Sequence, residues 1–154
     1  MSKQSEKYHL NLAGEYFVAA ELQRRGIHSS ITYGNAKKSD VIAFSESGDK
    51  AVAIEVKSTS RPSWVVGGSI PAESNRHWVF VNIPVDNSQP SSFYILTQAE
   101  IHNILSAKHK IFQISYRKRH GHDFNGKGVY SLLRSEIEAC RDNWVPITKF
   151  IKAT

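Results

Sequence analysis

Residues 40–58, DVIAFSESGDKAVAIEVKS, decide the fold, because two apolar segments flank a single Glu-Ser-Gly-Asp turn there. After the turn, every second side chain is apolar and lies on one face of an extended strand: Val52, Ile54 and Val56. Glu55 and Lys57 therefore lie together on the opposite face. The two segments predict an antiparallel hairpin with strands over residues 40–45 and 50–58.

The segment upstream of the hairpin predicts a helix and a further strand. Residues 12–25 are good helix formers, and Gly26 follows them as a stop signal. Apolar side chains occupy much of the helix circumference, which is typical of a well-buried helix. Residues 27–33 then suit a short strand that ends at a Gly-Asn turn.

The segment downstream of the hairpin adds strands to the predicted sheet. Residues 60–75 are rich in Pro, Gly and Ser and are interpreted as a loop, whereas residues 77–85, HWVFVNIPV, predict a strong strand. Another strand is expected at residues 93–96. This order of elements indicates a mixed α/β or α+β domain. The chain length predicts a single domain over residues 1–154.

The C-terminal third predicts further helices and one more strand. Thr97 suits an N-cap and Glu100 follows as in a capping box, so a helix is expected to run to about Ala107. Residues 110–119 are interpreted as a strand that ends in a basic cluster. Residues 131–140 have helical character. Helices are therefore expected to flank a central sheet.

The composition is that of an ordinary globular protein, with 40% apolar and 22% charged residues. No apolar stretch approaches the roughly 20 residues that span a bilayer, and the N-terminus lacks an apolar signal core. A cytoplasmic location with no membrane partner is therefore expected. The single cysteine, Cys140, excludes an internal disulfide. The net charge of +6 favours an anionic partner, most commonly nucleic acid.

Two acids and a lysine come together on the predicted hairpin. Asp40 begins the first strand, while Glu55 and Lys57 share one face of the second. Burying unpaired charge is costly, and a divalent metal gives these acids a function. Carboxylate oxygens suit Mg²⁺, which activates water and neutralises charge on a phosphate. An exposed ladder of salt bridges is the other interpretation of the same residues.

The spacing of these residues is similar to that of the PD-(D/E)XK nuclease superfamily. Asp40 is followed 15 positions later by Glu-x-Lys in an apolar strand, and Ser39 rather than Pro precedes it. Gly14-Glu15 at the start of an Ala-rich helix resembles the opening of archaeal Holliday-junction resolvases and related small nucleases. The resemblance covers residues 12–60 and implies a restriction-endonuclease-like fold with an αβββαβ core.

The resemblance also implies a role for each residue. Asp40 and Glu55 would bind Mg²⁺, or Mn²⁺ in its place, with the Val56 carbonyl as a further ligand. Lys57 would act as the catalytic lysine. Glu15 would supply an additional acid.

Basic side chains outside this group are candidates for contact with phosphate. Two precede the first hairpin strand, one follows the second, and three form the densest cluster of the chain: Lys37, Lys38, Arg61, Arg117, Lys118 and Arg119. Solvated surface charge is the alternative interpretation for each. Among the tryptophans, Trp64 lies in the predicted loop and is the best candidate for contact with a substrate.

The sequence thus predicts a metal-dependent endonuclease that hydrolyses DNA phosphodiester bonds. One alternative is a non-catalytic nucleic-acid-binding or interaction protein on a nuclease-like fold. Another is a nuclease that acts on RNA. Small nucleases of this kind often dimerise, so a homodimer is the expected arrangement if each subunit cuts one strand.

Overall fold

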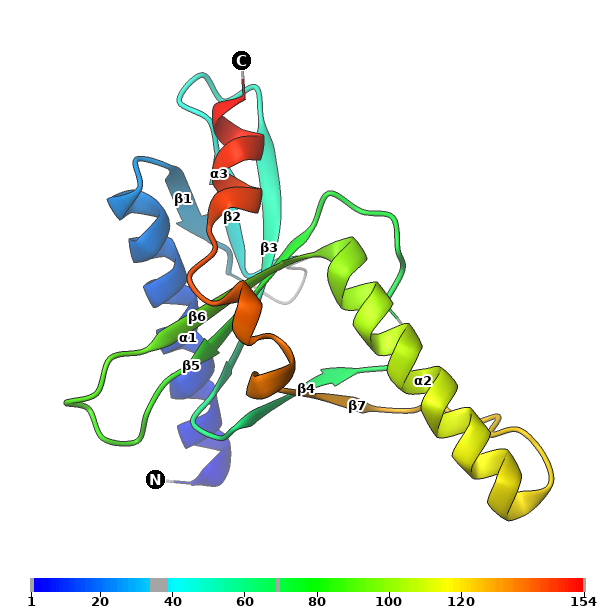
Figure 1. Ribbon diagram of the computed structural model, residues 1–154. Coiled ribbons are helices and arrows are strands. Elements are labelled where there is room, and N and C mark those ends of the chain that lie inside the picture. The colour runs from blue at the N-terminus through cyan, green and yellow to red at the C-terminus, as the bar shows by residue number, and fades with distance from the viewer. Residues whose placement is uncertain (1, 34–38, 69, 154) are drawn as a thin grey trace.

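A computed structural model describes residues 2–33, 39–68 and 70–153 (Figure 1). Ten helices and strands make up this part of the chain, together with two short 3₁₀ helices. In chain order they are α1 (Lys3–Arg24), β1 (His28–Ile31), β2 (Val41–Phe44), β3 (Ala51–Thr59), β4 (Ser63–Gly67), β5 (His77–Asn82), β6 (Ser92–Thr97), α2 (Gln98–His120), β7 (Tyr130–Leu133), η1 (Arg134–Glu136), η2 (Glu138–Cys140) and α3 (Val145–Lys152).

The main sheet has five strands in the order β1-β2-β3-β5-β6. The predicted hairpin is confirmed, because β2 and β3 pair antiparallel with Val41 opposite Ile54. Strands β3 and β5 are parallel, and β5 and β6 are antiparallel. Strands β4 and β7 form a separate antiparallel sheet. The mixed sheet with helices confirms the expected mixed α+β class.

Each face of the main sheet is covered by a different layer (Figure 1). On one face, α1 and α3 pack against a cluster that includes Val18, Val56 and Ile147. On the other face, α2 and the β4–β7 sheet pack against a cluster that includes Trp64, Trp78 and Ile101. Strand β5 lies between these layers, and all six of its residues are buried. The alternation along β3 places Val56 toward α1 and its two charged neighbours toward α2.

Helix α1 lies unusually close to β3 at one glycine. The helix begins at Lys3, earlier than the sequence suggested, and Ser2 caps it through a hydrogen bond to the Ser5 amide. A Cβ atom added to Gly14 would lie 1.8 Å from Ser58 Oγ. Only glycine therefore permits this approach, which fixes the position of the neighbouring Glu15.

Helix α2 corrects one prediction and confirms another. The Thr97–Glu100 capping box is present at its N-terminus. The predicted strand over residues 110–119 is wrong, because α2 continues through it to His120. No Gly or Pro interrupts residues 98–120, and Gly121, with φ of 76°, ends the helix.

The predicted helix over residues 131–140 is also wrong. That segment begins as β7, in which Leu132 pairs with Trp64 of β4, and continues as η1 and η2. The pairing joins segments more than sixty residues apart, so the sequence pattern within residues 131–140 does not indicate it. The same pairing places β4 inside the region that was expected to be a loop.

The connection from β3 to β5 departs from the expected αβββαβ order. Residues 60–68 and 70–76 contain β4 and no helix, so the crossover between the two parallel strands runs through β4. The helix that follows the core strands, α2, comes after β6 instead. In the described part of the chain, no helix is long and apolar enough to cross a membrane.

Candidate metal and nucleic-acid site

Asp40 lies where β2 begins, and backbone hydrogen bonds hold it between two strands. Its amide donates to the Ile54 carbonyl at 3.0 Å, and its carbonyl accepts from the Thr32 amide at 3.0 Å. Continuing the β2–β3 register by one residue places Asp40 opposite Glu55. Its Oδ2 accepts a hydrogen bond from the Val56 amide at 2.8 Å. The carboxylate is therefore fixed beside the Glu-Val-Lys segment.

Glu55 lies between two cationic side chains on the α2 face of β3. Lys57 Nζ donates to Glu55 Oε1 at 3.0 Å, and Arg76 Nη1 lies 3.5 Å from Oε2. Trp78 is the register partner of Glu55 on β5, and Lys57 Nζ lies 5.7 Å from the centre of its ring. The Glu55 side chain is only 19% exposed. This half-buried setting strengthens each charge interaction relative to open solvent.

The donor set beside Asp40 fits a hard divalent cation. Asp40 and Glu55 occupy opposed positions, where two like charges repel unless a cation lies between or beside them. The Val56 amide points toward Asp40, and the carbonyl of a strand residue points the same way as its amide. Two carboxylates and one carbonyl are oxygen donors of the kind that Mg²⁺ takes, with water completing its shell. These three residues are the ones that would hold the metal.

Glu15 reaches the sheet from the opposite layer. It is buried in α1, next to the glycine that contacts β3. Its charge also acts on Tyr33, whose pKa is raised chiefly by the hydrogen bond between its hydroxyl and that of Tyr16 and, among smaller causes, by Glu15. Within the described residues, no group of three His, Cys, Asp or Glu side chains is placed to hold a metal ion. The role of Glu15 as an additional acid stays a prediction.

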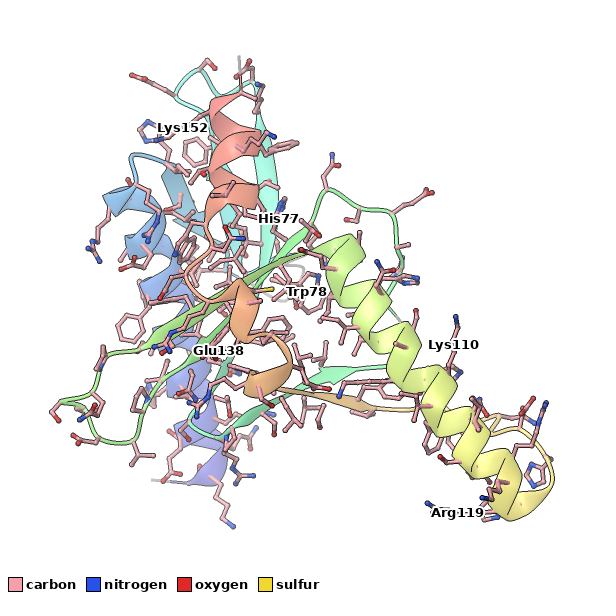
Figure 2. The ribbon with its side chains drawn as sticks, in the orientation of Figure 1. His77, Trp78, Lys110, Arg119, Glu138 and Lys152 are labelled. Atoms are coloured by element: carbon pink, nitrogen blue, oxygen red, sulfur yellow. The ribbon has the colours of Figure 1, made fainter. Side chains whose placement is uncertain are left out.

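Those predicted phosphate-contacting residues that the structure describes lie in two separate places. Lys37 and Lys38 lie outside the described residues. Arg61 is exposed two residues beyond the end of β3, where its carbonyl accepts a hydrogen bond from Asn82 Nδ2 at 3.0 Å. The cluster Arg117–Arg119 lies in the last turn of α2. Figure 2 shows Arg119 at the end of α2 that is remote from Trp78.

Trp64 does not present its ring to a substrate. It is 2% exposed, and its Nε1 donates to the Val81 carbonyl at 3.1 Å. Its ring packs edge-on against Phe80 and Tyr94. The expectation of a substrate contact is wrong, because β4 folds over the α2 face of the sheet and buries this side chain.

Sequence reasoning missed two residues that shape the site. Arg76 reaches Glu55 because it directly precedes β5, which lies parallel to β3. Gln98 accepts a hydrogen bond from Trp78 Nε1 at 2.7 Å and donates to the Pro71 carbonyl at 2.8 Å. The signal for both was weak, because only the strand register brings these residues together.

A scan against protein-family models and a search of curated proteins found no match to this chain. The site is therefore interpreted from its own geometry and chemistry.

Proposed function

We propose that the chain is a Mg²⁺-dependent endonuclease that hydrolyses DNA phosphodiester bonds at the Asp40–Glu55–Lys57 site. The observation that carries the proposal is the 2.8 Å hydrogen bond between the Val56 amide and Asp40 Oδ2. It holds one carboxylate beside a second, with a lysine two residues further along the same strand face. This arrangement supplies oxygen donors and a cation where a phosphate and its attacking water would meet.

Each residue has a distinct role in this mechanism. Asp40, Glu55 and the Val56 carbonyl would hold Mg²⁺. When bound, the metal would act as a Lewis acid toward the phosphate and the attacking water. Lys57 orients the attacking water and stabilises the negative charge that develops on the phosphate oxygens. Glu15 contributes negative charge from the α1 side.

The order of the elements and the net charge of the chain support the same function. A helix followed by an antiparallel hairpin and a strand parallel to β3 supports a restriction-endonuclease-like core, in which β4 replaces the crossover helix. The net charge of +6 supports a polyanionic substrate. A homodimer in which each subunit cuts one strand of a duplex fits the symmetry of DNA.

The test is nicking of supercoiled plasmid in Mg²⁺ by the wild type and by Asp40→Asn. The variant keeps an oxygen that accepts the Val56 amide, so it retains the local geometry while it loses the charge. We expect its cleavage rate to fall by about 10²- to 10³-fold. Equal activity in the two proteins, or a wild type that cuts no DNA in Mg²⁺, would contradict the proposal. Matched RNA oligonucleotides in the same assay test RNA as the substrate.

A non-catalytic nucleic-acid-binding protein is the second candidate. The observation that favours it is that both oxygens of Glu55 already contact cations, Lys57 and Arg76. A carboxylate has about four lone-pair sites, so these contacts leave room for a metal. Thermal unfolding with and without Mg²⁺ separates the two candidates. Metal-dependent stabilisation that is lost in Asp40→Asn supports the nuclease, and DNA binding without any metal effect supports the second candidate.

A further inference from the structure

The positive charge of the chain is concentrated in one short segment. Residues 108–128, here called the basic arm, contain six Lys or Arg residues and a single acid, Asp123. The arm therefore carries a net charge of +5 out of the chain's +6, with three histidines in addition. The other 133 residues are close to neutral. Attraction to a polyanion is accordingly a property of the arm.

The basic arm stands away from the core of the protein. It consists of the second half of α2 and the loop that follows, and no residue of α2 beyond Leu105 is buried. The loop is held against the helix by contacts within the arm. Gln113 bonds to both the amide and the carbonyl of Phe124 at 2.9 Å, and Arg117 pairs with Asp123 at 2.7 Å. Figure 2 shows Arg119 at the far end of this projection.

The other end of α2 is attached to the candidate metal site. The Gln98 amide donates to the Arg76 carbonyl at 3.1 Å, and Arg76 contacts Glu55. Gln98 is also bonded to Trp78, the register partner of Glu55. From Gln98 to Lys118 the helix rises by 20 residues, which is about 30 Å at 1.5 Å per residue. One helix thus separates the site from its densest cationic cluster by a fixed length.

Two lysines of the basic arm line a cavity midway along α2. A cavity of about 840 Å³ opens between α2 and residues 126–130. Lys110, His109 and Lys127 line it, and no acidic side chain is found among its described lining residues. The positive charge of the basic arm therefore extends from the end of α2 back to the middle of the helix.

We infer that α2 acts as a spacer that places the Arg117–Arg119 cluster of the basic arm on the backbone of duplex DNA about 30 Å from the bond that is cut. This inference rests on the proposed function. At 3.4 Å per base pair, the separation corresponds to about nine base pairs. A duplex matches a rigid spacer because it stays straight over this length, with a persistence length of about 150 base pairs. A single strand is flexible, so its binding has no sharp minimum length of this kind.

The arm's share of the binding is tested with Lys118→Ala/Arg119→Ala, which leaves the Arg117–Asp123 pair intact. Lys3→Ala/Lys7→Ala removes the same charge from exposed positions at the start of α1 and serves as the control. Fluorescence anisotropy without metal measures the Kd for duplexes of about 6 and about 24 base pairs over a range of salt. We expect the arm variant to lower the salt dependence, the slope of log Kd against log salt, by about 2 on both duplexes, because the arm alone can hold the short one. The control variant is expected to leave it near the wild-type value.

The outcomes separate this inference from the proposed function. No difference in Kd between the arm variant and the control, or an unchanged KM for cleavage of the long duplex by the arm variant, would overturn the spacer. The proposed function is measured separately, as Mg²⁺-dependent cleavage of the long duplex. Binding that depends on the arm in a wild type that does not cleave would contradict the nuclease and leave a DNA-binding arm. Cleavage of the 6- and 24-base-pair duplexes (about one half and two helical turns) with equal KM would contradict the spacer role of α2 and still support the nuclease.

Discussion

The hairpin site and the basic arm hold their charges in opposite ways. At the hairpin, Glu55 is 19% exposed and contacts two cations, and a backbone amide fixes Asp40. In the arm, the Arg117 side chain is 66% exposed and its neighbours face solvent. Chemistry on a phosphate requires atoms in fixed positions, whereas attraction to a polyanion requires only charge and reach. The difference indicates that position matters at one end of α2 and charge at the other.

The largest expected effect distinguishes the hairpin site from the basic arm, because one acts on kcat and the other on KM. Lys57→Met keeps an unbranched apolar side chain and removes the ammonium group near the Trp78 ring, so kcat should fall by about 10²- to 10³-fold with little change in KM. Lys118→Ala/Arg119→Ala should instead raise KM on a long duplex and leave kcat within about twofold. Steady-state cleavage of a labelled duplex measures both constants. A fall in kcat for the arm variant would mean that the basic arm, like the hairpin site, affects the chemical step.

The close approach of α1 to β3 gives the next largest effect. Gly14→Ala should lower the free energy of unfolding by about 1 to 3 kcal/mol, because the new methyl meets Ser58 Oγ. That hydroxyl has no hydrogen-bond partner, so Ser58→Ala should cost little by itself.

The double variant Gly14→Ala/Ser58→Ala provides the control for that prediction. It should recover part of the lost stability, because it removes the atom that the methyl meets. Urea denaturation of all four proteins measures the cycle. Strictly additive losses would show that α1 is not held close to β3 at this point.

A smaller effect concerns the loop of the basic arm. Gln113→Ala removes both backbone contacts to Phe124, so the loop should open locally while the body stays folded. Limited proteolysis is expected to cut within residues 121–128 several-fold faster, with global stability changed by less than about 1 kcal/mol. A matching fall in global stability would mean that the arm is part of the core.

The smallest effect is a pH dependence that arises in β5. Burial lowers the pKa of His77 below its usual 6.5, against a backbone carbonyl at Asn75 that raises it. The unfolded chain therefore takes up a proton at higher pH than the native one, and stability is lost as pH falls from 6.5 toward the lowered pKa. His77→Leu should flatten the stability profile between about pH 7.5 and about pH 5.5. An unchanged profile would assign the pH dependence to other groups.

The fold was predictable where the local pattern carried the structure. Alternation around Ile54 predicted β3, and the capping box at Thr97 predicted the start of α2. Strand-like alternation at Phe112, Ile114 and Tyr116 was misleading, because these residues lie on an exposed helix in which burial sets no pattern. The reliable signal there was the stop at Gly121.

The site was predictable only in part, because it depends on contacts between distant segments. Asp40 and Glu55 could be paired from the hairpin alone. Arg76 could not be placed beside Glu55, since the parallel register of β3 and β5 has no local signature. The burial of Trp64 likewise follows from the pairing of β4 with β7.

The proposed function requires that Asp40, Glu55 and the Val56 carbonyl hold a divalent metal. Crystals soaked in Mn²⁺, with anomalous diffraction recorded for the wild type and for Asp40→Asn, test this requirement. We expect an anomalous peak within about 2.0 to 2.3 Å of both carboxylates in the wild type and none in the variant. Well-ordered carboxylates with no metal between them, and Glu55 still held by Lys57 and Arg76, would contradict it.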